Sequence, residues 1–379
     1  MREKLIYGIT FLVVMIGCIT PYEPQGITPT EGLLVVEATL LAPVGTEVKL
    51  SRTIALDKLT YEPVSATVKI LSDDGVEYRM TETQTGTYTL EQEFTYRDQV
   101  KYALDIEWSG KHYRSAYVIP SLTPDMSFRW AYNEKYEQLE IMVSVDNPDV
   151  DVAYYRWSFK ENWEFMASHF ATHRWDPVTR FLSVNDPFSS DNSYYCWSRD
   201  SSTHFILGSS EKKTTTSLRD KVVQTIPLGS PKFRYLYHID VKQHAIPKEA
   251  YNYFRNLQDN VETTGSLFGA QPTEMKGNIT CVDNLKEAVI GYFVATTEAS
   301  RATYIEAAEV PEMKERSFDC LDDPVKFSDH LTAYDAGYFI SLFDPNPEIE
   351  TEYMPMRCVD CTRKGGTKNR PAWWKTDHY

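Results

Sequence analysis

Residues 66–80 read ATVKILSDDGVEYRM. Apolar and polar side chains alternate in 66–71 and again in 76–80, which is the period of a strand with one buried face. Asp73-Asp74-Gly75 lies between the two runs, and an Asp-Gly pair favours the tight turn of a β-hairpin. This stretch therefore predicts two antiparallel strands and indicates a chain built from β-sheet.

Similar runs lie on both sides of this hairpin. They are 33–40, 47–52, 86–90, 100–108 and 112–118. About seven short strands separated by turn residues predict an immunoglobulin-like β-sandwich over 32–121. There is no cysteine between Cys18 and Cys196, so the core of this domain must be stable without the disulfide of antibody domains.

A second and larger domain is predicted for 122–379. Its alternating runs are 139–145, 153–159, 194–198, 204–208, 235–244, 277–281 and 288–295. Residues 247–262 differ, because Pro247 favours a helix start and Ala250, Phe254 and Leu257 fall on one helical face. We predict an all-β fold class: the N-terminal sandwich, then a larger β-sandwich with one helical insertion and a cysteine-containing tail.

The composition excludes some classes of function. The chain has 379 residues and a formal net charge of -15. Such an acidic chain repels nucleic acid and anionic lipid headgroups. We therefore expect no nucleic-acid partner.

The N-terminus carries an export signal. Residues 1–17 begin with Arg2 and Lys4 and continue as an apolar run that is too short to span a bilayer. Met15-Ile16-Gly17-Cys18 resembles the cleavage site of a bacterial lipoprotein. We predict a signal peptide at 1–17 and a covalent lipid on Cys18 as the only cofactor. Residues 18–31, which hold three prolines, then form a tether.

The other cysteines predict disulfides, because export places a chain in an oxidising compartment. Two bridges among Cys281, Cys320, Cys358 and Cys361 are the main interpretation, and we favour Cys320 joining the tail. Five cysteines besides Cys18 leave at least one unpaired. The spacing of Cys358 and Cys361 also fits a four-thiolate zinc site with the other two.

Tryptophans and basic residues suggest where a partner binds. Trp157 and Trp197 lie in alternating runs and are expected in the core. The C-terminal segment is the only strongly basic part of the chain, and aromatic side chains among cations are typical of interface hot spots. The partner-binding candidates are Arg363, Lys364, Lys368, Arg370, Trp373 and Trp374. The same segment could equally be a docked last strand with its charges in water.

No catalytic motif is evident. His169 and His173 are spaced like ligands on a helix, with Glu164 as the nearest third ligand, but Phe170 stands where zinc proteases need Glu. We expect no metal site and no enzyme activity. A metal-dependent hydrolase is the less favoured alternative.

Several ordered segments resemble a known family. They are Leu33 to Glu37, Tyr154 to Trp157, Trp163-Glu164, Lys242-Gln243-His244, Glu249 to Tyr251, Gly265 to Phe268, Gly277 to Ile279, Gly291 to Phe293, Cys358 to Cys361, Gly365 to Thr367 and Pro371 to Trp374. In this order they resemble the Bacteroidota lipoprotein family called domain of unknown function 4249. The resemblance implies an outer-membrane lipoprotein encoded beside a TonB-dependent transporter.

The expected function is therefore non-catalytic. We expect an accessory or ligand-binding lipoprotein, anchored by lipid in the outer membrane, with a TonB-dependent β-barrel transporter as partner. The sequence leaves open whether it faces the cell surface or the periplasm. The alternatives are a surface adhesin or structural lipoprotein and, less favoured, the hydrolase.

Overall fold

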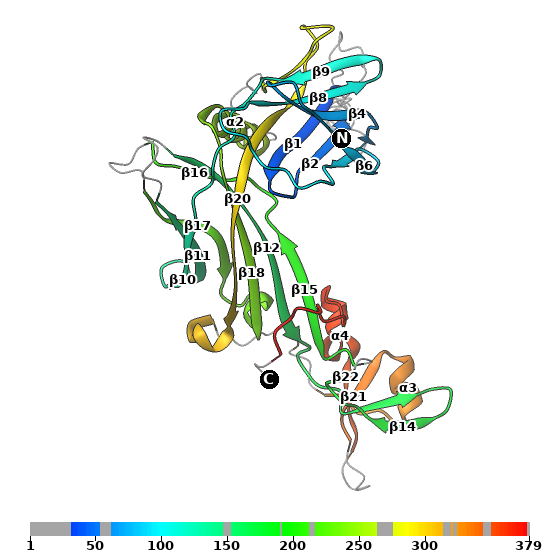
Figure 1. The fold of residues 1–379 in the computed structure, drawn as a ribbon. Coiled ribbons are helices and arrows are strands. Elements are labelled where there is room, and N and C mark those ends of the chain that lie inside the picture. The colour runs from blue at the N-terminus through cyan, green and yellow to red at the C-terminus, as the bar shows by residue number, and fades with distance from the viewer. Residues whose placement is uncertain are drawn as a thin grey trace, which may run out of the picture.

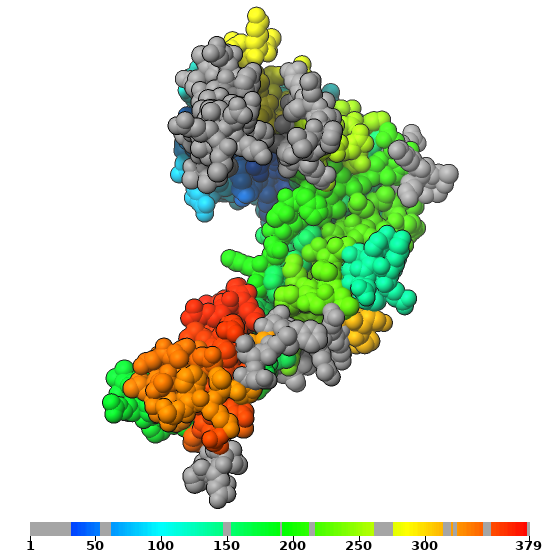
Figure 2. Space-filling view, turned by 180° about the vertical axis from the view of Figure 1, so that it is seen from behind, coloured from blue at the N-terminus to red at the C-terminus, as the bar shows by residue number. Residues whose placement is uncertain are grey.

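The chain forms an elongated molecule with a sandwich at one end and a small unit at the other, as the opposite views in Figure 1 and Figure 2 show. The structure is a computed structural model that describes residues 32–53, 62–146, 153–189, 192–211, 217–263, 276–313, 320, 324–343 and 350–376. The predicted signal peptide, Cys18 and the tether lie outside these residues. Strands dominate the described part, so the predicted all-β fold class is confirmed.

One ten-stranded sheet runs through most of the molecule. Its strands, in order, are β15 (Tyr195–Ser201), β12 (Tyr154–Met166), β18 (Leu236–Ala245), β20 (Ile290–Glu306), β1 (Leu34–Ala42), β2 (Glu47–Arg52), β7 (Thr87–Thr89) and β6 (Thr81–Gln84), with β16 (Ile206–Ser209) beside β12 and β3 (Glu62–Pro63) beside β2.

Strand β20 joins the two halves of this sheet. Its first half pairs in parallel with β1, from Val35 opposite Ile290 onward. Its second half pairs antiparallel with β18, where His244 lies opposite Glu298. At the start of β20, Gly291 has a φ of +153°, and a Cβ there would collide with the carbonyl oxygen of Val36. Only glycine therefore allows β1 and β20 to approach this closely.

The N-terminal sandwich closes against a second sheet of five strands. These are β19 (Ile279–Cys281), β9 (Lys111–Ser115), β8 (Tyr102–Trp108), β4 (Thr67–Ser72) and β5 (Glu77–Arg79). The hairpin predicted from 66–80 is β4 and β5, with Gly75 at a positive φ in the turn. Residues 32–121 do not complete this sandwich alone, because β19 and β20 come from much later in the chain. They cover sheet edges that would otherwise be open at β9 and β1.

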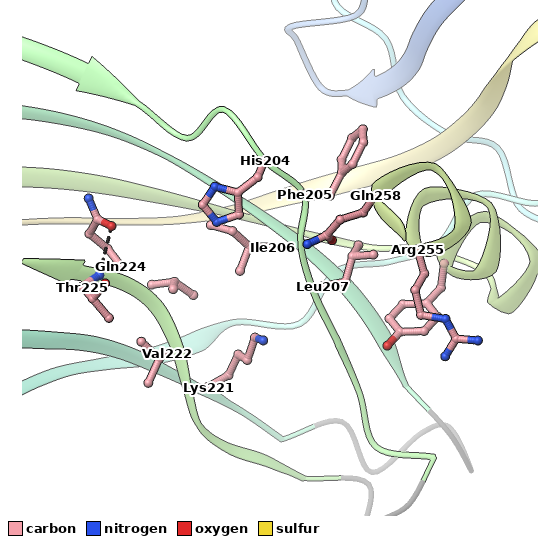
Figure 3. Close-up of a pocket in the computed structure, with 12 residues that line it drawn as sticks. His204, Phe205, Ile206, Leu207, Lys221, Val222, Gln224, Thr225, Arg255 and Gln258 are labelled. Carbon is pink, nitrogen blue, oxygen red and sulfur yellow. Dashed lines mark hydrogen bonds between the residues drawn. The ribbon is translucent and has the colours of Figure 1, made fainter. Parts of the chain in front are cut away.

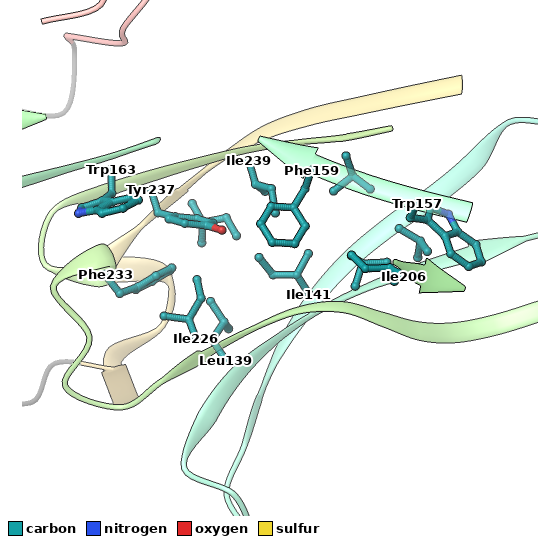
Figure 4. Packing of buried hydrophobic residues seen from close by; sticks show 14 of the residues in the cluster. Leu139, Ile141, Trp157, Phe159, Trp163, Ile206, Ile226, Phe233, Tyr237 and Ile239 are labelled. Carbon is teal, nitrogen blue, oxygen red and sulfur yellow. The ribbon is translucent and has the colours of Figure 1, made fainter. Parts of the chain in front are cut away.

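The middle of the molecule is a second sandwich. Strands β12, β18 and the end of β20 face a three-stranded sheet of β10 (Met126–Asn133), β11 (Gln138–Val145) and β17 (Leu218–Pro227). Aromatic and branched side chains fill the space between the two sheets, as Figure 4 shows around Trp157, Phe159 and Tyr237. Trp157 is 1% exposed and Trp197 is 8% exposed, so both predicted core tryptophans are confirmed as buried.

A small distal unit lies at the far end from the N-terminal sandwich (Figure 1). Its sheet has the strand order β14 (Phe181–Val184), β13 (His173–Asp176), β21 (Tyr338–Leu342) and β22 (Glu352–Pro355). Helix α3 (His330–Asp335) begins at Asp329, whose side chain accepts a hydrogen bond from the backbone N–H of Thr332. The region predicted as one larger sandwich thus contains this additional sheet.

Helix α2 (Lys248–Thr263) confirms the predicted helical insertion and packs against the ten-stranded sheet. The short helices are η1 (Pro231–Phe233), η2 (Ala307–Glu309), η3 (Pro311–Met313), α4 (Met356–Val359) and η4 (Cys361–Lys364). In the described ranges, no helix combines the length and apolar character that a membrane crossing requires.

Candidate ligand-binding site

Alternate side chains along the strands of the ten-stranded sheet point to its two opposite faces, and one of these faces carries the candidate site. On β20, Phe293 belongs to the core of the N-terminal sandwich and Ile305 to the core of the middle sandwich. Both are odd-numbered residues of one strand, so both cores lie on the same face of β20. The even-numbered residues, such as Tyr292 and Glu298, point to the opposite face.

Helix α2 covers part of that opposite face. Ala250, Tyr253 and Phe254 pack against Tyr154 of β12 and Val294 of β20. The helix is amphipathic, so its other side stays in water. It therefore stands on the sheet where the N-terminal and middle sandwiches meet, and a hollow lies on each side of it.

The larger hollow, here called the charged hollow, has a volume of about 800 Å³. This is within the range of pockets that hold small organic ligands. Its apolar wall includes Phe205, Tyr253, Phe254, Leu257 and Tyr292. Its charged lining consists of Glu37, Glu47, Lys49, Arg156, Lys160, Lys242, His244 and Glu298.

Arg156 is the central cation of the charged hollow. Its guanidinium carbon lies 5.0 Å from the ring centroid of Phe254, a cation–π contact. Burial lowers the pKa of Arg156, and the charge of Glu37 opposes that shift. No carboxylate of the described residues lies within ion-pair distance of Arg156, whereas Lys49 and Lys242 of the same hollow are paired with Glu47 and Glu298.

Glu298 holds the opposite side of the hollow. Its carboxylate accepts a hydrogen bond from Lys242 Nζ at 2.8 Å and lies 3.3 Å from His244 Nε2. Burial raises the pKa of Glu298, but the hydrogen bonds and positive charges of these two partners outweigh it and lower the pKa to about 2. Glu298 is therefore ionised at neutral pH and fixes the His244 ring.

The smaller hollow lies on the other side of α2 and has a volume of about 430 Å³. Figure 3 shows Leu207 of β16, Lys221 of β17 and Arg255 of α2 around it. Lys221 is half-buried, and burial lowers its pKa. Among the described residues no carboxylate forms an ion pair with Lys221, but the polar side chains of this hollow do not converge as they do beside Arg156.

The disulfides differ in part from the prediction. Cys320 pairs with Cys358, as favoured. Cys361 pairs with Cys196 of β15, which the prediction left out. Cys281 is a free buried thiol in the N-terminal sandwich, so its predicted role in a bridge is wrong. The two bridges use all of the predicted zinc thiolates except Cys281, which excludes the four-thiolate site.

The basic C-terminal segment is docked on the middle sandwich. Thr367 pairs with Trp197 at the edge of β15. Trp374 is 4% exposed and donates from Nε1 to Glu164 at 2.7 Å, so its predicted place on a partner surface is wrong. Lys364 is half-buried and donates to Ser168.

Four other partner-binding candidates stay accessible. They are Arg363, Lys368, Arg370 and Trp373. Trp373 is 53% exposed, and its ring lies against His238 at a centroid distance of 4.8 Å. We call these four residues the basic tail surface.

The residues of the hydrolase alternative serve other contacts. Glu164 is fully buried and accepts the Trp374 hydrogen bond. His173 lies in β13, where its ring packs on Phe343. Across the described ranges, no three His, Cys, Asp or Glu side chains are placed to hold a metal ion.

Sequence reasoning missed the charged hollow. Arg156 and His244 lie in predicted strands, but alternation alone gives only their face and not their neighbours. The pairing of β12 with β18 sets Arg156 opposite His244, and no local pattern predicts that register. The only available signal was the even spacing of Arg156, Lys242 and His244 on outward-facing positions.

Comparison with known families gives one match. The profile described as "Domain of unknown function (DUF4249)" matches residues 19–302. The chain belongs to the DUF4249 family. The matched residues include the strands and the helix α2 that line both hollows. The match ends within β20, before the tail that carries Cys320, Cys358 and Cys361. No match is found among curated proteins.

Proposed function

We propose that this DUF4249 protein is an exported, lipid-anchored binding protein without catalytic activity. It is acylated at Cys18, resides at the outer membrane as a Bacteroidota lipoprotein and serves a TonB-dependent β-barrel transporter as an accessory subunit. The proposal allows either the cell surface or the periplasmic face.

The observation that carries the proposal is the pair of disulfides in a chain with an apolar segment before Cys18. The bridge from Cys196 to Cys361 and the bridge from Cys320 to Cys358 are typical of proteins that fold outside the cytoplasm. Two acyl chains on Cys18 would hold the protein at a membrane stably.

The shape supports a role in binding. The charged hollow lies where the two sandwiches meet, and the basic tail surface lies on the far part of the middle sandwich. The tail cations stand out on a chain with a net charge of -15, and this favours contact with an acidic surface. The protein can therefore hold a ligand and a protein partner at separate places.

Mass spectrometry of the protein extracted from membranes tests the anchor. We expect a mature chain that begins with an acylated Cys18, and we expect Cys18→Ala to release the protein from the membrane. An unmodified cysteine, or a mature chain that starts elsewhere, would remove the lipid anchor.

Affinity capture from detergent-solubilised membranes tests the accessory role. We expect the tagged full-length protein to recover a β-barrel transporter and Arg370→Glu to weaken that recovery. Arg79→Glu, which changes an exposed arginine on the N-terminal sandwich, is the matched control. Recovery of no β-barrel protein by the acylated wild type would contradict the role.

A further inference from the structure

We propose that the charged hollow binds an acylated amino-acid carboxylate that carries an apolar side chain, as at the C-terminus of a peptide. Arg156 would bind the carboxylate, His244 the amide N–H, and the aromatic wall the side chain. The inference deepens the proposed binding role, but it does not depend on the lipid anchor or on the transporter.

The guanidinium of Arg156 has no ion pair among the described residues. A partly buried guanidinium without a counter-ion is unfavourable, because burial removes water that its partners do not replace. A carboxylate is the group that a guanidinium binds in bidentate geometry. A ligand carboxylate would therefore supply the ion pair that the described chain does not provide.

The second step is the free nitrogen of His244. The side chain is 9% exposed, and its Nδ1 has no hydrogen-bond partner in the described structure. Burial lowers the pKa of His244, and the Glu298 hydrogen bond at Nε2 only partly opposes this. A neutral ring that donates from Nε2 to Glu298 leaves Nδ1 as an acceptor. The ligand must therefore bring a donor, and an amide N–H fits.

The third step is the distance between these two groups. Arg156 and His244 lie directly opposite each other on β12 and β18. The Cβ atoms of such a pair are about 5 Å apart. One amino acid carries its carboxylate and its amide nitrogen on the same carbon atom. A single ligand residue can therefore reach both protein groups.

The fourth step is the wall beside them. The Phe254 ring lies against the Arg156 guanidinium, and the rings of Tyr253 and Tyr292 contact each other at a centroid distance of 5.4 Å and a tilt of 41°. Together with Leu257 they form an apolar surface for a ligand side chain.

The charge of the lining argues against a phosphate. The carboxylates Glu37, Glu47 and Glu298 line the hollow with the cations. Glu47 pairs with Lys49 and Glu298 with Lys242, which leaves Glu37 against the two cations Arg156 and Lys160. One negative ligand charge balances this remainder, whereas a dianion would leave an excess negative charge in the hollow.

Isothermal titration calorimetry on the purified full-length protein tests the inference. The probes are acetyl-Ala-Phe with a free carboxylate, its C-terminal amide, and the acid with its Phe nitrogen methylated. We expect the acid to bind at least tenfold more tightly than either analogue. Acetyl-Phe distinguishes the ligand source: equal affinity indicates a small acylated amino acid, and weaker binding indicates a peptide terminus.

Three variants distinguish binding at this site from a general effect of charge. We expect Arg156→Gln to remove the preference for the acid over the amide, and Arg156→Lys to keep part of it. Lys221→Gln removes a cation of the smaller hollow that likewise has no ion pair among the described residues, and it should change affinity less than twofold. Equal binding of acid and amide to the wild type, or an equal loss in Lys221→Gln, would overturn the inference.

The outcome is independent of the membrane experiments. Acid binding without capture of a β-barrel would contradict only the accessory role. Capture of a β-barrel by a protein that binds none of the probes would contradict only this inference.

Discussion

The N-terminal sandwich and the distal unit hold together by different means. In the described residues, the sandwich has one core of 21 buried side chains, including the free thiol of Cys281. The distal unit has two small clusters of four and three buried side chains, and one of the four is Cys358 of a disulfide. A large apolar core is stable without covalent links, whereas small clusters bury too little surface to hold a unit alone.

The same contrast applies to the tail. Residues 350–376 contribute few strands, and they are fixed to the body by the Cys196–Cys361 bridge, by the pairing of Thr367 with Trp197 and by buried Trp374. The tail thus depends on a few strong attachments, and changes to those attachments should test the comparison best.

The largest effect is expected from removal of the Cys196–Cys361 bridge. The bridge closes a loop of 165 residues, which corresponds to roughly 5 kcal/mol in the chain-entropy model. In Cys196→Ala/Cys361→Ala, hydrogen exchange should rise in the tail and in β15 but not in the N-terminal sandwich.

Cys281→Ala is the control for this experiment. It removes a buried sulfur from the large core and should lower the free energy of unfolding by about 1 kcal/mol. If the bridge variant loosened the N-terminal sandwich as much as the tail, the two regions would not be independently stabilised.

The next effect is expected at Gly291, which lets β20 join the two halves of the sheet. Gly291→Ala places a Cβ against Val36 at a positive φ, and we expect a loss of about 3 kcal/mol in stability, measured by urea unfolding. Gly110→Ala is the matched control, since Gly110 also has a positive φ but no atom near its Cβ position. We expect about 1 kcal/mol there. Equal losses would show that the close approach is unimportant.

A smaller effect is expected from the tail tryptophans. Trp374→Phe removes the donor to the buried Glu164 carboxylate, which should lower the free energy of unfolding by about 2 kcal/mol. Trp373→Phe changes an exposed ring and should stay within about 0.5 kcal/mol. Urea unfolding measures both. A reversed order would mean that the tail is held mainly by its exposed face.

A last effect is expected from pH at the junction between the regions. The pKa of Glu298 is about 2 in the folded protein, below its ordinary value near 4.5. Its stabilising contribution is therefore complete above pH 4.5 and is lost as the pH falls towards 2. The pKa of His244 is also lowered in the folded protein, from its ordinary value of 6.5. Protonation of this ring below pH 6.5 therefore disfavours the folded state too, so stability again falls as the pH falls.

Thermal unfolding between pH 6 and pH 3 measures this contribution. We expect Glu298→Gln to unfold at a temperature that depends less on pH than that of the wild type. Glu77→Gln, which breaks an exposed pair with Lys69, should leave the pH dependence unchanged. Parallel curves for the wild type and Glu298→Gln would contradict the assignment.

Much of the strand pattern could be predicted from local sequence. The hairpin at 66–80 and the helix near 247–262 formed as predicted, since both depend on turn chemistry and periodicity within a few residues. Strands β10 and β17 were not predicted. In β10, Met126, Phe128, Trp130 and Tyr132 do alternate with other residues and face the core, so that signal was overlooked. In β17, buried and exposed positions follow no clear alternation. In the distal unit, α3 and β21 were not predicted either, because this part of the sequence has no strong helical or strand periodicity.

The candidate site could be predicted only in part. The sequence predicted two disulfides, but it assigned Cys281 to a bridge that the structure forms with Cys196. A pairing between residues 165 positions apart depends on where two distant elements meet. The same holds for Trp374, whose sequence neighbours are basic and exposed while its ring is buried.

The sequence by itself determined the all-β class, the position of the long helix and the chemistry of the cysteines, because these follow from local alternation and residue type. Only the tertiary structure decided that β20 serves both sandwiches, that Cys196 meets Cys361, and that Arg156 faces His244 beneath α2. These contacts arise from strand register and from the packing of segments far apart in the chain. A periodic pattern says which face of a strand is buried, but not which other strand will bury it.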